Sequence, residues 1–195
     1  MTFLKEKLGS FFQQMPPHQF DSSIFLIQNC IYPRILMSPA DALYSINFLR
    51  LLISLRVPNI NVRDILTQIF RGKSFQGLIP TIHCCTEKEA ENLGIFLIKF
   101  FEMINGYTNE TVWNEECAQY EGFKKKISNE KNGSKLEIQT FEDWQNTDGR
   151  LDEILTRSII SCLKNPKEQF MKTRCALKIL FRIRKMFPRR SKEAE

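Results

Sequence analysis

The sequence has few of the groups on which catalysis depends. It contains only two histidines, His18 and His83, and neither a GxGxxG nor a GxxxxGK[ST] run. A hydrolytic triad needs a base beside its nucleophile, and nucleotide phosphates are usually cradled by glycine-rich loops. We therefore expect a protein that is not an enzyme, binds no cofactor and has no small-molecule substrate.

Long apolar runs are also missing. Arg50, Arg56 or Lys99 interrupts the longest candidates, so none reaches the roughly 20 residues that span a bilayer. The first residues lack the uninterrupted apolar stretch and cleavage site of a secretory signal. These features predict no membrane contact and thiols that stay reduced, as in the cytosol or nucleus.

Six cysteines are present, but their spacing is irregular and no CxxC occurs. A structural zinc site needs four ligands at suitable spacing, which this sequence does not suggest. His83, Cys84 and Cys85 are adjacent in the chain, yet neighbouring side chains on a helix point about 100° apart. We interpret the cysteines as small buried hydrophobic residues and predict no metal.

The sequence is rich in apolar residues with helical spacing. Hydrophobic residues make up 43% of it and phenylalanine alone contributes 16, enough for a sizeable core. Ser38-Pro39-Ala40-Asp41 has the pattern of a helix start, and Thr86 to Glu89 that of a capping box. The expected helices lie near residues 2–14, 21–31, 38–56, 61–71, 75–84, 86–105, 108–127, 150–164 and 165–187.

Helices in succession predict an all-α fold, arranged as an irregular α-solenoid in which antiparallel helices stack as in HEAT or armadillo proteins. The segment 128–134 (SNEKNGS) reads as a loop. The segment 135–150 is ambiguous: alternating Leu136, Ile138 and Phe141 suggest a short strand, which the helical context makes the less favoured interpretation. The expected organisation is an N-terminal helix (1–17), a main helical stack (18–127), a loop-rich insertion (128–150), a C-terminal helical hairpin (151–188) and a charged tail (189–195).

Positive charge is concentrated near the C-terminus. The chain carries a net charge of +6, but residues 164–192 hold eleven basic side chains and one acid, a local balance of +10. On the last helix, the large apolar residues fall on one broad arc: Phe170, Leu177, Leu180, Phe181, Ile183 and Phe187. The opposite, basic arc and its extension form the candidate site: Arg174, Lys178, Arg182, Lys185, Arg189 and Arg190. Three interpretations of the basic arc remain open: a solvated helix face, a site that binds RNA phosphates, and a site that binds an acidic protein surface.

Several segments, taken in order, resemble one known family. They are Ser23 to Arg34, Ser38 to Tyr44, Cys85 to Ala90 and Glu115 to Phe123, followed by the single residues Arg174, Leu177 and Leu180 and the pair Phe187-Pro188. Over roughly residues 23–188 they resemble the C-terminal helical region of the second subunit of the THO complex. Members of that family are far longer, so the resemblance implies a fragment, a partial gene model or a shortened relative.

The resemblance also implies a function. It suggests a nuclear scaffold that packages nascent mRNA for export, holds other THO subunits and engages a DEAD-box RNA helicase. In this interpretation the helicase hydrolyses ATP, and the family offers no catalytic residues to assign here. Direct binding of RNA through the basic last helix is the alternative.

Overall fold

The computed structural model describes residues 2–13, 22–71, 77–129 and 133–188. Ten α-helices account for most of this part of the chain. They are α1 (Thr2–Gln13), α2 (Ser22–Leu26), α3 (Tyr32–Met37), α4 (Pro39–Ser54), α5 (Val62–Arg71), α6 (Leu78–Cys84), α7 (Glu87–Asn105), α8 (Glu110–Val112), α9 (Phe141–Leu163) and α10 (Phe170–Ile183). Short π-helical turns η1 (Ile27–Ile31) and η2 (Trp113–Cys117) extend α2 and α8, and η3 (Glu121–Phe123) is a 3-10 turn.

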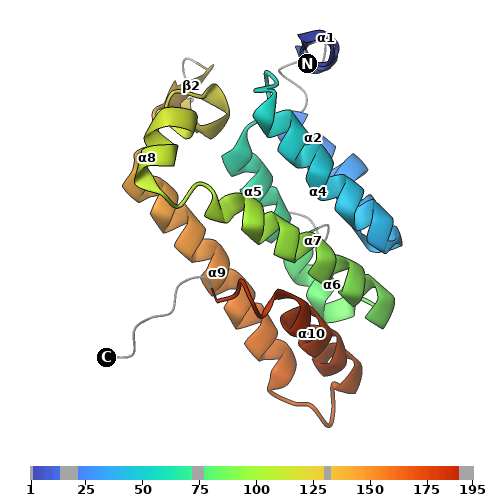
Figure 1. The fold of residues 1–195 in the computed structure, drawn as a ribbon. Coiled ribbons are helices and arrows are strands. Elements are labelled where there is room, and N and C mark those ends of the chain that lie inside the picture. The colour runs from blue at the N-terminus through green and yellow to red at the C-terminus, as the bar shows by residue number, and fades with distance from the viewer. Residues whose placement is uncertain (1, 14–21, 72–76, 130–132, 189–195) are drawn as a thin grey trace.

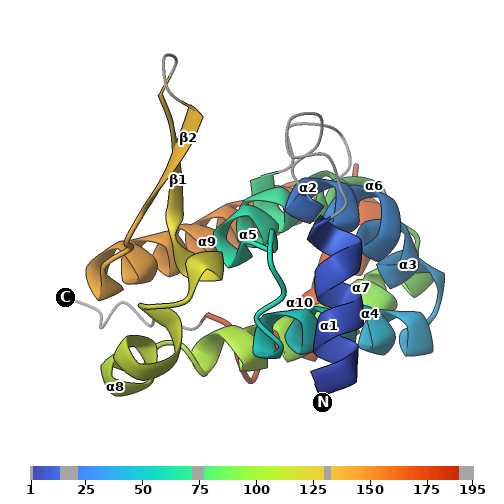
Figure 2. The same cartoon turned by 90° about the horizontal axis from the view of Figure 1, so that it is seen from above.

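The predicted all-α class is confirmed. In the described part of the chain the sole sheet is an antiparallel hairpin of β1 (Lys125–Asn129) and β2 (Gly133–Glu137), paired from Lys125↔Glu137 to Asn129↔Gly133. The hairpin projects away from the helices (Figure 2). None of the helices described is long and apolar enough to cross a membrane.

Side-chain caps determine where three long helices begin. The Ser38 hydroxyl accepts a hydrogen bond from the Asp41 amide at 3.1 Å at the start of α4. Thr86 and Glu89 form a reciprocal capping box on α7, as the sequence predicted. Thr140 and Asp143 form a second such box on α9, which the sequence analysis missed. Each cap of this kind stabilises a helix by about 1 kcal/mol.

The prediction of a loop-rich insertion over residues 128–150 is wrong for most of that segment. Helix α9 begins at Phe141 rather than near residue 150, because the Thr140 capping box starts it and Trp144 is buried in its first turns. The strand interpretation is correct only up to Glu137. Residues 130–132 lie outside the described part. The helix expected over 108–127 is also broken, since it consists of short turns followed by β1.

Helix α7 lies at the centre of the fold. Figure 1 shows α4 along one side of it and α10 along another, and α3 contacts it as well. Its side chains Leu93, Phe96, Leu97, Phe100 and Phe101 are fully buried. A helix that is apolar on most sides must be covered by several neighbours, which is the arrangement observed.

A second aromatic core holds the far end of α7 and the base of the hairpin. The rings of Trp113 and Trp144 stack with centroids 5.0 Å apart, and Phe123 lies 5.3 Å and 5.6 Å from these two rings. Tyr107, just after α7, contacts Phe123 at 5.2 Å. Such pairs contribute about 0.5–1.5 kcal/mol each beyond their burial. They attach η2, η3 and the start of α9 to one another.

Helix α10 approaches α7 closely at Gly94. A Cβ atom at Gly94 would lie 2.9 Å from Cβ of Arg182 and 3.7 Å from Cα of Ile179. The absence of a side chain at Gly94 therefore lets the two helices pack at short range.

The Gly94→Ala substitution tests this contact. We expect it to lower the free energy of unfolding by about 1–3 kcal/mol, because the added methyl group forces α10 away from α7. Gly9→Ala in α1 is the matched control, since its Cβ would meet only ordinary contacts at 3.8 Å. The control should stabilise the helix by about 0.5–1 kcal/mol in urea denaturation. Equal effects of the two substitutions would contradict the close approach.

Candidate functional site

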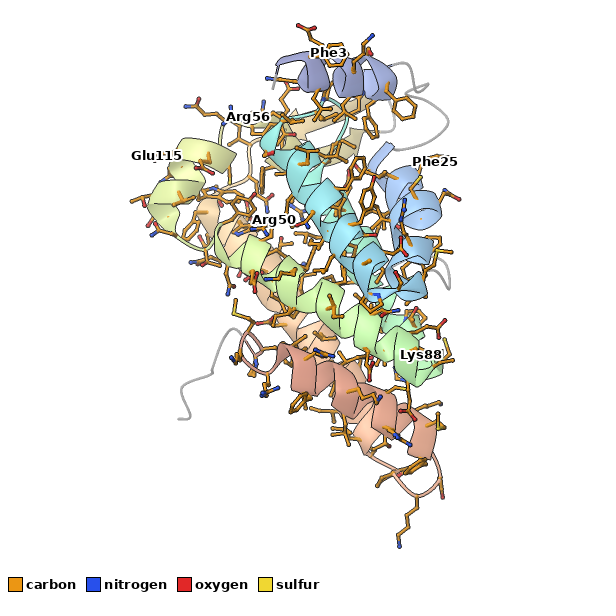
Figure 3. The ribbon with its side chains drawn as sticks, turned by 45° about the vertical axis from the view of Figure 1, so that its right-hand side comes forward. Phe3, Phe25, Arg50, Arg56, Lys88 and Glu115 are labelled. Atoms are coloured by element: carbon orange, nitrogen blue, oxygen red, sulfur yellow. The ribbon has the colours of Figure 1, made fainter. Side chains whose placement is uncertain are left out.

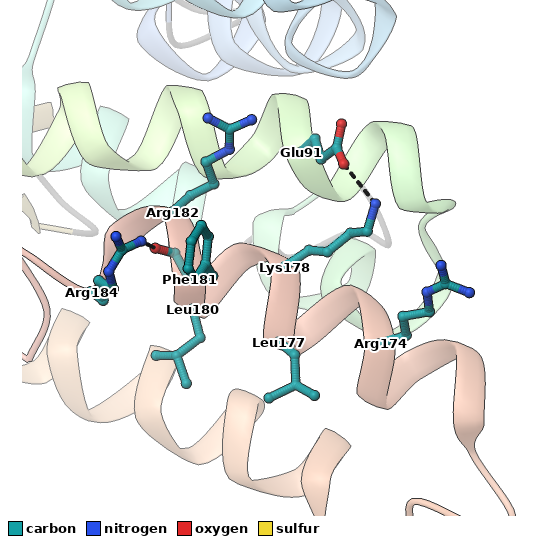
Figure 4. Close-up of a pocket in the computed structure, with 8 residues that line it drawn as sticks. All are labelled: Glu91, Arg174, Leu177, Lys178, Leu180, Phe181, Arg182 and Arg184. Atoms are coloured by element: carbon teal, nitrogen blue, oxygen red, sulfur yellow. Dashed lines mark hydrogen bonds and ion pairs between the residues drawn. The ribbon is translucent and has the colours of Figure 1, made fainter.

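Two of the predicted basic residues form ion pairs with α7. Arg174 Nε lies 3.0 Å from Glu87 Oε1, and Lys178 Nζ lies 3.0 Å from Glu87 Oε2 and 2.6 Å from Glu91 Oε1. Figure 4 shows the Lys178–Glu91 pair bridging the two helices. A feature of the sequence could have predicted these pairs. Glu87 and Glu91 are four residues apart on α7, and Arg174 and Lys178 are four residues apart on α10, so each pair lies on one face of its helix.

These pairs shift the protonation equilibria of their members. Hydrogen bonds from Lys178 lower the pKa of Glu91, and hydrogen bonds to Glu91 and Glu87 raise the pKa of Lys178. Both side chains are partly exposed, and ion pairs in contact with solvent contribute little to stability. Their main effect is to orient α10 along α7.

The other predicted basic residues have different environments. Arg182 and Lys185 are exposed, and within the described residues neither forms an ion pair. Arg189 and Arg190 lie outside the described residues. Arg184, which the candidate site did not include, donates a hydrogen bond to the Phe181 carbonyl and places its guanidinium 3.9 Å from the centroid of the Phe181 ring.

The apolar arc of the last helix is only partly buried. Ile183 and Phe187 are buried, but Phe170, Leu177 and Phe181 are 61%, 50% and 63% exposed. The buried face of α10 consists of smaller side chains together with two isoleucines, namely Cys175, Ala176, Ile179 and Ile183. The short approach at Gly94 favours these residues, because bulky phenylalanines would not fit against α7 there.

An open hollow of about 790 Å³ lies along the exposed side of α10. Leu177, Leu180 and Phe181 provide its apolar lining. Its charged lining consists of Glu91, Arg174, Lys178, Arg182 and Arg184. The site therefore combines an apolar strip with a surplus of positive charge.

His83 joins α6 to α9 through two hydrogen bonds. Its Nε2 lies 3.1 Å from the Ser158 hydroxyl, and its Nδ1 lies 3.3 Å from the Cys162 thiol. Burial, and to a lesser degree the charge of Lys172, lowers the pKa of His83, while burial raises the pKa of Cys162. Both groups are therefore neutral near pH 7, and a protonated thiol is a weak nucleophile.

The neighbouring cysteines are packed in the same way. The Cys175 thiol donates to the Cys85 carbonyl at 3.3 Å, and burial raises the pKa of Cys85 to about 12. Over the described ranges, no three His, Cys, Asp or Glu side chains are placed to hold a metal ion. Cys85, Cys162 and Cys175 are at least partly buried, as predicted, but Cys30 and Cys84 are exposed, so the predicted burial is wrong for these two.

Comparison with known proteins gives a match to one family. The family model for transcription factor/nuclear export subunit protein 2 (Tho2) matches residues 1–195. THO complex subunit 2 of Arabidopsis thaliana is 30% identical over 173 residues, which cover 88% of this chain and 9% of that protein. The Homo sapiens protein of the same name is 26% identical over 166 residues, covering 84% and 10%. That of Saccharomyces cerevisiae is 37% identical over 99 residues, covering 51% and 6%.

The chain thus spans about a tenth of the length of the curated relatives it matches. No solved structure matches it.

The environment of His83 predicts a loss of stability in acid. Its pKa in the folded chain is below the ordinary value of 6.5, so the unfolded chain binds more protons at low pH. The free energy of unfolding should therefore fall as the pH decreases below about 6.5. His83→Gln should remove this part of the pH dependence in urea denaturation at pH 7.5 and 5.0. If both proteins lost the same stability between these pH values, the proposed protonation of His83 on unfolding would be ruled out.

Proposed function

Because the chain belongs to the Tho2 family of transcription factor/nuclear export subunit proteins, we propose that it is a non-enzymatic scaffold segment of a THO complex. It binds other THO subunits through its helical surfaces and supports the assembly of nuclear mRNA–protein particles for export. The observation that carries this proposal is the family match over the full 195 residues.

The exposed surface supports a role in protein binding. Large apolar side chains are exposed on several helices, including Phe3 on α1, Tyr44 on α4 and Phe181 on α10. Figure 3 shows Phe3 on α1, on the far side of the molecule from α10. Aromatic residues, methionine and arginine are enriched in the centres of protein interfaces. Surfaces of this kind on separate faces suit a scaffold that has several neighbours.

The proposal also covers the architecture of the chain, its location in the cell and a further partner. The helices form one part of an irregular α-solenoid, the protein resides in the nucleus, and a DEAD-box RNA helicase is a further partner. ATP hydrolysis belongs to that helicase.

Affinity purification of the tagged full chain from nuclei tests the scaffold function. We expect other THO subunits and the helicase to be recovered, also after nuclease treatment, because direct protein contacts do not depend on RNA. A tagged nuclear protein of similar size and charge serves as the control. Recovery of no THO subunit, or loss of all of them after nuclease treatment, would contradict the proposal.

A second candidate function is direct RNA binding by the basic end of the chain. The +10 balance over residues 164–192 and the exposed Arg182 and Lys185 favour it. Arg174 and Lys178 contribute less, because Glu87 and Glu91 neutralise them. Binding of this kind would involve the phosphate backbone and would weaken with salt.

The double substitution Arg182→Glu/Lys185→Glu tests RNA binding. If both side chains contact phosphates of a single strand, the slope of log affinity against log salt should fall in magnitude by about 1.4. Lys5→Glu/Lys7→Glu on α1 is the matched control, because it makes the same charge change at two exposed lysines. The measurement is fluorescence anisotropy with single-stranded RNA at several salt concentrations. Absence of binding by the unaltered chain at low salt would exclude this candidate.

A further inference from the structure

Four large apolar residues of α10 form a strip on the side of the helix turned away from α7. We define the outer strip as Phe170, Leu177, Leu180 and Phe181. Their spacing places them on one face of the helix. Phe170, Leu177 and Phe181 are each at least half exposed, whereas Ile179 and Ile183 on the opposite face are fully buried. The outer strip therefore lies mostly outside the core, and only Leu180 is partly buried against it.

The backbone beneath the outer strip is held firmly in place. On the inner face, α10 packs against α7 at the close approach of Gly94 to Arg182. The ion pairs from Arg174 and Lys178 to Glu87 add a second attachment. Because α10 already has the conformation in which it would bind a partner, it loses little conformational entropy on binding.

The charges around the outer strip define the chemistry of its partner. Four cations line the hollow, but Glu87 and Glu91 neutralise Arg174 and Lys178, so Arg182 and Arg184 supply its positive charge. A ligand that covers Leu177 and Phe181 would bring its edges close to Arg184 on the same helix. Acidic groups at those edges are favoured, and basic groups would be repelled.

An RNA base fits the outer strip less well than an apolar side chain does. The guanidinium of Arg184 already covers one face of the Phe181 ring, at 3.9 Å from its centroid. The adjacent lining residues Leu177 and Leu180 are aliphatic and offer no stacking surface. Single-stranded nucleic acids are usually bound by aromatic faces that are open for stacking.

We propose that the outer strip of α10 is the docking site for an amphipathic helix of another THO subunit, with an apolar stripe flanked by aspartate and glutamate. The proposal rests on the scaffold function proposed above. The apolar stripe packs on Leu177, Leu180 and Phe181, and the acidic flanks pair with the surrounding arginines. From Phe170 to Phe181 the outer strip is roughly 17 Å long, which suits about three turns of a partner helix.

Site-specific photo-crosslinking in the purified complex tests the proposal. The substitution Phe181→p-benzoylphenylalanine is made in the full chain, with Phe11→p-benzoylphenylalanine on α1 as a control of similar exposure, 59% against 63%. The Phe181 position should crosslink to an acid-flanked helix of another subunit, and the Phe11 position should not crosslink to that helix.

Every other result contradicts the docking site. Crosslinks from position 181 to RNA, to a second copy of this chain or to another segment of the same chain would each overturn it. No crosslink in a complex that still contains the other subunits would overturn it and leave the scaffold function standing. Failure to recover any THO subunit would instead remove the scaffold function itself.

The crosslinked segment, made as a synthetic peptide, allows a quantitative test. Leu177→Ser and Phe181→Ser should each weaken binding of the peptide to the full chain at least about ten-fold, as truncations of central interface residues do. Ile160→Ser on α9 is the matched control, because Ile160 is also 50% exposed. Circular dichroism confirms that each variant is folded. Unchanged affinity of folded Leu177→Ser and Phe181→Ser variants would overturn the proposal.

Discussion

The structure depends on the burial of α7, which is apolar around most of its circumference. Phe96, Phe100 and Phe101 are all fully buried, and one neighbouring helix cannot cover side chains that point in several directions. Helix α4 covers one side and α10 another, while α3 completes the contacts. The requirement to cover α7 brings residues far apart in the sequence together, and each covering helix keeps an outer face available to other molecules.

At α10 this requirement decides which apolar side chains are buried. The large residue Phe181 points to solvent, and small residues such as Ala176 face α7. Gly94 provides the reason, because α10 comes too close there for bulky side chains to fit between the helices. The same orientation turns Arg174 and Lys178 towards acids of α7. In the sequence, α10 has an apolar arc opposite a basic arc. In the structure, its exposed side is largely apolar and has charged residues along its edges.

Burial also determines the chemical state of the groups that could otherwise react. The imidazole of His83 bonds to Ser158 and Cys162 between two helices, and the burial that stabilises this contact lowers the pKa of the imidazole and raises that of the thiol. Each of these groups therefore stays in its neutral form. These packed groups belong to the core, and the proposed scaffold function depends on the exposed surfaces of the helices.

The sequence alone determined the helical class and the starts of α4 and α7, because capping involves hydrogen bonds within four consecutive residues. The start of α9 carried the same kind of local signal at Thr140, but the alternating residues just before it suggested a strand. Only the tertiary structure decided which side of α10 is buried. The side with Ala176 and Ile179 and the side with Leu177 and Phe181 are both apolar enough to face a core. The first side is buried because α10 meets α7 at Gly94, a glycine more than 80 residues earlier in the chain.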